Sequence, residues 1–202
     1  MNKLKHIDHG QYVLDRIQYR EYDCVNPNVK RKEYTESDWN SDDILNNPKY
    51  SYSHLYYNAN PFVYVTTPKM VCVFGLDRRS NTMNLQFTDY KTDPHMKSFF
   101  EFIRNLEFQQ MMYLGLDDSN SDVYTSQIRY SKNDKYDPTL VVKLPFTYNK
   151  YDVDIYHDDF PISILNIQRF SRMKCDIYID KIWRFNGKYI CKWKAKQIYV
   201  HN

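Results

Sequence analysis

The sequence has few of the residues on which common enzyme motifs depend. It contains only four glycines in 202 residues, and it has no G-x-x-x-x-G-K-[ST] motif, so a loop that cradles phosphate groups is excluded. The G-x-S-x-G motif of many hydrolases and the H-E-x-x-H motif of zinc proteases are also absent. We therefore expect a protein that is not an enzyme and that needs no cofactor.

Long apolar runs and paired cysteines are also missing. No run approaches the roughly 20 residues that span a bilayer, and the polar start at residues 1–6 lacks the apolar stretch of a signal peptide. We therefore expect an intracellular protein that is not secreted and does not contact a membrane. No C-x-x-C pair is present, so free structural thiols are expected at Cys24, Cys72, Cys175 and Cys191.

The charge of the chain is small but unevenly distributed. The formal net charge is +3. Residues 169–202 contain nine Lys or Arg and two Asp, a net charge of +7, which leaves −4 on the first 168 residues. This segregation indicates a nucleic-acid partner for the C-terminal part, which the charge of the whole chain does not.

The hydrophobic pattern predicts a mainly β protein with one prominent inserted helix. Residues 62–67, 69–76, 82–88 and 139–146 have the composition or alternation of strands. Asp93-Pro94 is a good helix start, and an apolar stripe at helical spacing continues toward Gly115, so a helix is expected at about 94–114. Residues 1–60 have no clear period. They are predicted to be an N-terminal extension with short strands and an acidic loop, followed by a nucleic-acid-binding domain at 61–202.

The last 29 residues carry the most informative pattern. Asn186-Gly187 separates two strand-like runs, and this dipeptide is the strongest short signal for a β-hairpin. Because side chains alternate faces along a strand, one face of the second run is predicted to be cationic and the other apolar and aromatic. The cations are Lys188, Lys192, Lys194 and Lys196, and the opposite face includes Tyr189 and Trp193.

A cationic strand face beside aromatic rings suits single-stranded nucleic acid, because cations follow the phosphates and rings stack on bases. Trp183 and Arg184, in the first run of the hairpin, extend the candidate set. In the alternative, Trp183, Tyr189 and Trp193 fill the core, and the lysines protect an edge strand from aggregation. Two further basic points at predicted turns complete the set: Arg78 with Arg79, and Lys132 with Lys135.

The segment His157-Asp158-Asp159 is the one acidic and histidine cluster in the sequence. Such side chains can bind a divalent metal in a nuclease, but these lie just before Pro161, where solvated turn residues are common. A metal-dependent nuclease is therefore one alternative function. A second alternative is a structural or scaffold protein whose basic C-terminal face contacts another protein.

Three blocks of sequence resemble a known family. Residues 67–76 read TPKMVCVFGL, residues 136–145 read YDPTLVVKLP, and the closing block at 179–200 contains GKYICKWKAKQIYV. These blocks are similar to the single-stranded DNA-binding proteins of large nucleocytoplasmic DNA viruses, of the iridovirus and asfarvirus type. The chain departs from the family pattern at Val73, where a proline is usual, and at Ile190-Cys191, where a second glycine is usual.

The resemblance implies an OB-like Greek-key β barrel that binds single-stranded DNA, or RNA, during viral DNA replication or recombination. Carried over residue by residue, it points to Lys188, Trp193, Lys194 and Lys196 as groove residues and brings no catalytic residues. It implies a location in the host cytoplasm or a viral replication compartment. Replication proteins and further copies of the chain are the other expected partners.

Overall fold

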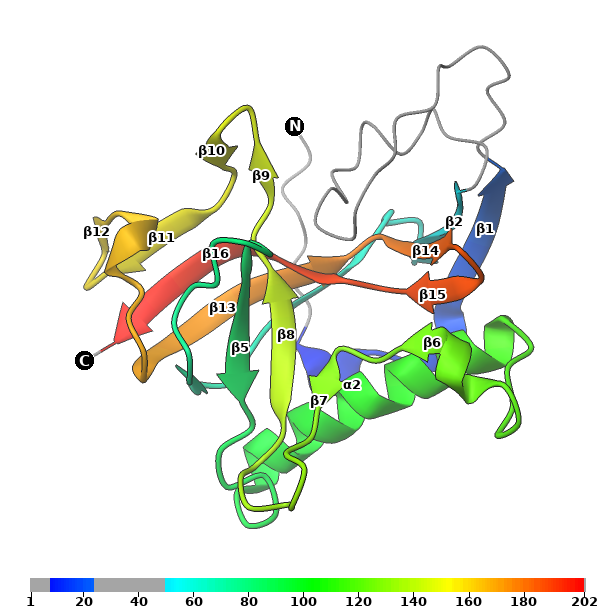
Figure 1. The fold of residues 1–202 in the computed structure, drawn as a ribbon, viewed down its shortest axis with the longest axis horizontal. Coiled ribbons are helices and arrows are strands. Elements are labelled where there is room, and N and C mark those ends of the chain that lie inside the picture. The colour runs from blue at the N-terminus through cyan, green and yellow to red at the C-terminus, as the bar shows by residue number, and fades with distance from the viewer. Residues whose placement is uncertain (1–7, 24–49, 202) are drawn as a thin grey trace.

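The fold is described by a computed structural model that covers residues 8–23 and 50–201 (Figure 1). The predicted acidic loop and Cys24 lie outside the described residues. The expected mainly β architecture is confirmed, and α2 (Pro94–Tyr113) is the one α-helix within the described ranges. Short 3-10 helices lie at His9–Gln11 (η1), Leu14–Arg16 (η2), Ser121–Val123 (η4) and Ile164–Asn166 (η5).

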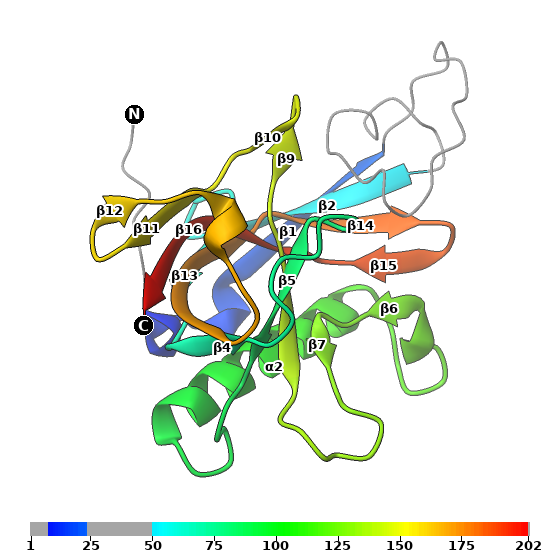
Figure 2. The ribbon, with the colours of Figure 1, turned by 60° about the vertical axis from the view of Figure 1, so that its left-hand side comes forward.

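The described strands form two larger sheets and a short hairpin (Figures 1 and 2). The first sheet contains Ile17–Asp23 (β1), Tyr50–Tyr57 (β2), Tyr124–Thr125 (β6), Lys181–Phe185 (β14) and Lys188–Ile190 (β15). Their order across the sheet is β1–β2–β14–β15–β6. The short hairpin consists of Phe146–Thr147 (β9) and Lys150–Tyr151 (β10).

The second sheet is larger. It contains Val63–Thr66 (β3), Met70–Cys72 (β4), Thr82–Gln86 (β5), Ile128–Arg129 (β7), Thr139–Lys143 (β8), Asp154–His157 (β11), Phe160–Pro161 (β12), Ser171–Ile179 (β13) and Trp193–His201 (β16). The order is β12–β11–β16–β13–β4–β5–β8–β7, with β3 also paired to β13.

Strand β16 connects distant parts of the second sheet. It pairs antiparallel with β13 and parallel with β11, and at its N-terminal end it also pairs parallel with β8. The pairings β13–β4, β4–β5 and β5–β8 are antiparallel. Strands β13, β4, β5, β8 and β16 are thus joined by consecutive pairings that return to β13.

Alternation along β5 and β8 explains why one side of these strands is buried and the other is available for binding. Met83 and Leu85 on β5 and Leu140 and Val142 on β8 are fully buried. The intervening residues are only partly buried, because successive side chains on a strand point to opposite faces. The outer face of this pair of strands is therefore partly exposed to solvent.

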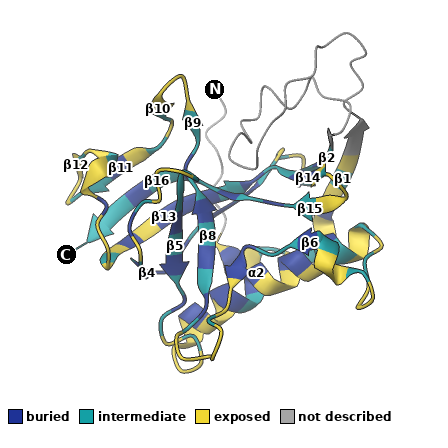
Figure 3. Cartoon of the chain, viewed as in Figure 1, coloured by how far each residue is buried: buried dark blue, intermediate teal, exposed yellow. Residues whose placement is uncertain are grey.

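Helix α2 packs an apolar face against the sheets. Asp93 caps it, since its Oδ1 accepts hydrogen bonds from the backbone N–H groups of His95 at 2.8 Å and Met96 at 3.2 Å. Phe99 and Ile103, one helical turn apart, are both fully buried. Figure 3 shows buried and exposed residues alternating around the helix. The helix predicted at about 94–114 is confirmed.

The Asn186-Gly187 hairpin is also confirmed, but it is divided between the two sheets. Asn186 and Gly187 have φ angles of 47° and 76°, and positive φ at both central positions is the requirement of a type I′ turn. The turn joins β14 to β15 in the first sheet. The chain segments beyond them, β13 and β16, belong to the second sheet. The predicted long hairpin therefore bends from one sheet into the other.

Parts of the predicted N-terminal extension are integrated with the C-terminal half. Strand β2 pairs with both β1 and β14. Leu55 and Tyr57 of β2 belong to the same core cluster as Trp193 of β16. The division of the chain near residue 60 stays a prediction.

Trp193 is a sensitive point of this core, because its side chain is only 2% exposed and its ring lies 6.4 Å from that of Phe102 on α2. We expect Trp193→Ala to lower the free energy of unfolding by about 3–5 kcal/mol. Urea denaturation measures this change. The matched control is Phe108→Ala, a residue of α2 that is 59% exposed. A loss as small as that of the control would contradict the packing role of Trp193.

Candidate nucleic-acid interface

A basic groove of about 690 Å³ lies beside the β14–β15 hairpin and the outer face of β5 and β8. Three cationic residues line it, namely Arg129, Lys188 and Lys192, and none of the described lining residues is acidic. Arg129 belongs to β7, Lys188 to β15, and Lys192 to the connection into β16. The fold therefore brings cations from three separate segments to one concave surface.

The floor and walls of the groove contribute neutral groups. Thr82 and Asn84 of β5 lie on the outer face of their strand and line the groove. Phe185 and Ile190, from the two strands of the hairpin, add apolar surface. This combination of cations, hydrogen-bonding side chains and apolar surface is suited to a flexible polyanion that also carries flat rings.

A buried carboxylate on α2 holds the segment that leads to Arg129. Glu107 Oε1 accepts the backbone N–H of Gln127 at 2.6 Å, and its Oε2 accepts the hydroxyl of Ser126 at 2.6 Å. Ser126 Oγ in turn accepts the backbone N–H of Ile128 at 3.0 Å. These bonds fix the backbone directly before Arg129, so α2 positions one of the three groove cations.

Burial is the dominant influence on the Glu107 carboxyl and raises its pKa. The hydrogen bonds from Ser126 and Gln127 and the charge of Arg129 act in the opposite direction. The net shift is upward, so the folded protein holds the Glu107 proton more tightly than the unfolded chain does.

The two faces of the β14–β15 hairpin carry different candidate residues. Phe185 pairs directly with Lys188, and both line the groove. Arg184 pairs with Tyr189, and the guanidinium carbon of Arg184 lies 5.8 Å from the centre of the Tyr189 ring. Because neighbouring positions on a strand face opposite ways, Arg184 and Tyr189 lie on the far side of the hairpin from the groove.

Lys194 and Lys196, of the four predicted lysines, lie near carboxylates of the described residues. Lys194 Nζ lies 2.8 Å and 3.1 Å from the two carboxylate oxygens of Asp180, and its side chain is only 19% exposed. Lys196 Nζ lies 3.7 Å from Asp152 Oδ1. The predicted row of four cations is therefore divided: Lys188 and Lys192 line the groove, whereas Lys194 and Lys196 lie outside it.

Both tryptophans of the candidate set are buried, as the core-packing alternative expects. Trp193 packs in the main core, and Trp183 is 5% exposed in a small cluster with Tyr52, Phe185 and Ile190. A ring buried to this extent has no free face on which a base can stack. Half-buried Tyr189 packs partly against the main core.

Arg78 and Arg79 are exposed in the β4–β5 loop, whose end reaches the groove at Ser80. Asp77 fixes the turn, because its carboxylate accepts the backbone N–H of Arg79 at 2.9 Å and the hydroxyl of Ser80 at 2.7 Å. Lys143 Nζ donates to the carbonyl oxygen of Ser80 at 2.7 Å and ties this loop to β8. The two exposed arginines thus belong to an anchored loop that reaches the groove at Ser80.

Lys132 and Lys135 are exposed between β7 and β8 and do not line the groove. Lys135 Nζ lies 5.4 Å from the centre of the exposed Tyr136 ring. Asp158 and Asp159, which follow His157, form the two-residue turn between β11 and β12. Within residues 8–23 and 50–201, no group of three His, Cys, Asp or Glu side chains is placed to hold a metal ion.

Sequence reasoning missed Arg129 as a groove residue. It lies in a run that reads as a short strand, and nothing local distinguishes it from a solvated arginine. Its place in the groove depends on the contact of Glu107 with residues 126 and 127. Cys72, Cys175 and Cys191 are free and buried, as predicted.

The chain matches no protein-family model, and a search of curated proteins also gives no match. In the part of the chain that the structure describes, no helix is both long enough and apolar enough to cross a membrane.

The raised pKa of Glu107 predicts a pH-dependent stability. The folded state favours the protonated acid, so the free energy of unfolding falls as the pH rises from the ordinary pKa of 4.5 through the raised folded-state pKa. Glu107→Gln keeps an acceptor for the Gln127 N–H and removes the titration. We therefore expect the variant to gain stability relative to the native protein across this window, measured by urea denaturation at a series of pH values. A stability difference that does not change with pH would contradict this role of burial.

The Lys194–Asp180 pair predicts that Lys194 acts mainly in stability. Lys194→Met removes the ammonium group and leaves the half-buried Asp180 carboxylate without it, at an expected cost of about 3 kcal/mol. The double variant Lys194→Met with Asp180→Asn should recover much of this loss, because the isolated charge is also removed. Urea denaturation of the single and double variants measures both effects. A fully stable Lys194→Met protein would show that the pair does not hold the fold.

Proposed function

We propose that the protein binds single-stranded DNA in the groove lined by Arg129, Lys188 and Lys192, without catalysing a reaction. The observation that carries this proposal is the convergence of these three cations on one concave surface whose described lining contains no carboxylate. The cations bind successive phosphates, and Phe185 and Ile190 provide the apolar surface against which bases lie. Sequence preference is weak, because contacts to phosphates and base faces read no base edges.

The strand pairings support an OB-like barrel as the architecture behind this groove. The ring formed by β4, β5, β8, β16 and β13 has five strands, as an OB barrel does. Numbered by sequence, β5 and β8 are the second and third strands of this barrel. The β4–β5 loop then joins strands one and two, and the β14–β15 hairpin lies between strands four and five.

This assignment places the groove where OB barrels bind their ligands. OB barrels hold oligonucleotides on the face of strands two and three, between the loop that joins strands one and two and the loop that joins strands four and five. Ser80, Thr82, Val141 and Lys188 come from these elements and line the groove. The location of the groove and its charge therefore support the same ligand.

A role in viral DNA replication or recombination is the setting that we propose, and the resemblance of the three sequence blocks supports it. Replication proteins and further copies of the chain are proposed partners in that setting. The β14–β15 hairpin is held by pairing with β2 on one side and β6 on the other, so the groove is largely formed before DNA binds. A preformed groove lowers the entropy cost of binding.

Charge reversal of the groove tests the proposal directly. We expect Arg129→Glu, Lys188→Glu and Lys192→Glu together to weaken binding to a fluorescent oligo-dT, measured by anisotropy over a range of salt concentrations. Removing three phosphate contacts should make the slope of log affinity against log salt shallower by about 2, because each contact to a single strand contributes roughly 0.7.

The matched control carries the same charge change on exposed residues away from the groove, as Lys91→Glu, Lys97→Glu and Arg104→Glu. It should keep most of the affinity. An equal loss of affinity in both triple variants would show that only the net charge of the protein matters, and it would contradict binding in the groove. If the native protein fails to bind oligo-dT at low salt, the DNA proposal fails and a protein partner for the basic face is favoured. Cleavage of the oligonucleotide with Mg²⁺ that His157→Ala abolishes would establish the nuclease alternative.

A further inference from the structure

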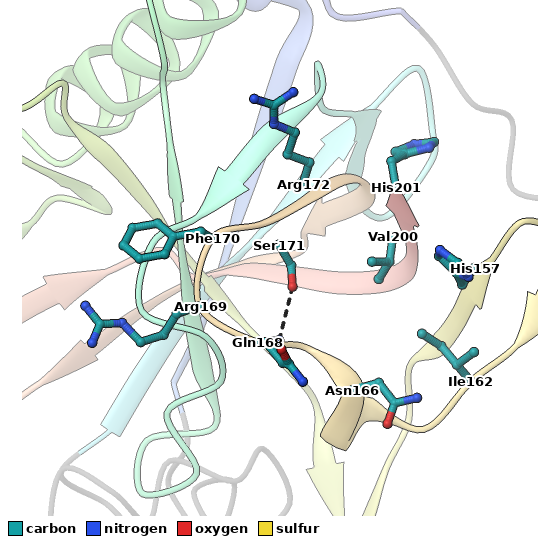
Figure 4. A pocket seen from close by; sticks show the side chains of 10 residues that line it. All are labelled: His157, Ile162, Asn166, Gln168, Arg169, Phe170, Ser171, Arg172, Val200 and His201. Atoms are coloured by element: carbon teal, nitrogen blue, oxygen red, sulfur yellow. Dashed lines mark hydrogen bonds between the residues drawn. The ribbon is translucent and has the colours of Figure 1, made fainter.

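A second basic and aromatic surface lies where the preceding loop enters β13. Arg169, Phe170 and Arg172 are all exposed, and the Phe170 side chain is 65% exposed. The guanidinium carbon of Arg169 lies 5.4 Å from the centre of the Phe170 ring. Figure 4 shows the Phe170 ring beside Arg169, with the Arg172 side chain directed upward from the start of β13. The groove described above is lined by none of these three residues.

The backbone at Phe170 is unusual for a bulky residue. Phe170 is the third residue of a turn closed by a hydrogen bond from the Ser171 N–H to the Gln168 carbonyl oxygen at 3.3 Å, and its φ is 64°. A positive φ at this turn position favours glycine or asparagine, and a bulky residue there is a rare exception. Because the ring is exposed, packing in the core does not account for a phenylalanine at this place.

Other described residues reinforce the contrast. Most non-glycine residues with positive φ are Asn or Asp, which tolerate that conformation. Tyr148 is a second aromatic exception, but it shares a two-residue hairpin turn with Asn149, where positive φ is required of both residues. Phe170 lies in no such hairpin. Strained backbone positions cluster at functional sites, so an exposed aromatic ring held in such a position beside Arg169 points to a binding role.

This surface is connected to the groove through one loop. The Phe170 N–H donates to the carbonyl oxygen of Cys72 at 2.7 Å, and a Cβ atom at Gly75 would lie 3.3 Å from the backbone nitrogen of Arg169. The start of the β4–β5 loop therefore contacts the Phe170 turn, while Ser80 at its end lines the groove. Ser80 follows Gly75 by five residues, which span at most about 18 Å when extended. Arg78 and Arg79 lie between these two positions.

The space beside the Phe170 turn also has a cationic lining. A cavity of about 460 Å³ is lined by Arg169, Phe170 and Arg172 together with His157 and His201, and none of its described lining residues is acidic. An anionic ligand that leaves the groove past Arg78 and Arg79 would therefore meet a second surface lined by arginines. The nearest carboxylate to this lining that the contacts show is Asp158, whose Oδ2 lies 3.8 Å from His157 Nδ1 at the side of the cavity formed by β11.

We propose that Arg169, Phe170 and Arg172 form a second contact site for the DNA strand that occupies the groove. Phe170 stacks on one base, and the two arginines bind the phosphates on either side of it. The strand passes from the groove along the β4–β5 loop to this site. The inference rests on the proposed function, and it adds that the bound strand is longer than the groove alone accommodates.

Phe170→Gly is the decisive variant, because glycine suits the positive φ and removes the ring. Its thermal midpoint should equal or exceed that of the native protein. Its affinity for an oligo-dT of about 16 nucleotides should fall by about 5- to 150-fold, whereas an oligo-dT of about 6 nucleotides, which reaches only the groove, should bind unchanged. Phe170→Tyr keeps a stacking ring and should keep the affinity for both lengths.

The control variant Phe108→Ala removes an exposed phenylalanine from α2 and should bind both lengths as the native protein does. Arg169→Ala with Arg172→Ala should make the salt dependence for the longer oligonucleotide shallower by roughly 1.4, and Arg104→Ala should not. If Phe170→Gly binds the longer oligonucleotide with native affinity, or loses both lengths equally, the second site is refuted while the groove stands. If the native protein binds neither length, the proposed function itself fails.

Discussion

The arrangement of the molecule depends on the backbone pairing of β16. This one strand pairs with β13, β11 and β8, and it buries Trp193 where its pairing with β8 begins. The contact with β8 brings the first residues of β16 against the strand pair β5–β8. The hairpin that precedes β16 is consequently placed beside that pair. This contact and the pairing of β15 with β6 together bring the three groove cations to one surface.

Charge in the C-terminal segment is divided between two tasks. Lys194 is paired with the partly buried Asp180, whereas Lys196 lies near the exposed Asp152. Lys188 and Lys192 line a surface without carboxylates. The positive charge of the C-terminal segment is therefore larger than the charge that this segment contributes to the groove. Arg129, from a different region of the chain, adds a third cation to the groove.

Local signals in the sequence were sufficient for some elements and not for others. Asn186-Gly187 and the Asp93-Pro94 helix start specify their geometry through a few neighbouring residues, and both are found as predicted. The face on which each lysine lies depends on distant events. A register shift in the pairing of β13 with β16, between Asp176 and Ile177, changes which side chains of β16 share a face beyond Ala195. In addition, Asp180 forms an ion pair with Lys194. Neither the register shift nor the ion pair can be read from the residues near each lysine in the sequence. The same is true of the hydrogen bonds of Glu107 that hold the segment before Arg129.

The parallel pairing of β8 with β16 also has a consequence for how the chain folds. Val142 and Trp193 are partners although 51 positions separate them, so closing this contact carries the entropy cost of a long loop. Folds dominated by such distant pairings form slowly. During synthesis, the strands that make the floor of the groove emerge well before the strand that completes it. The chain therefore passes through a period in which the edge of β8 at Val142 and Lys143 is unpaired and open to association with other chains.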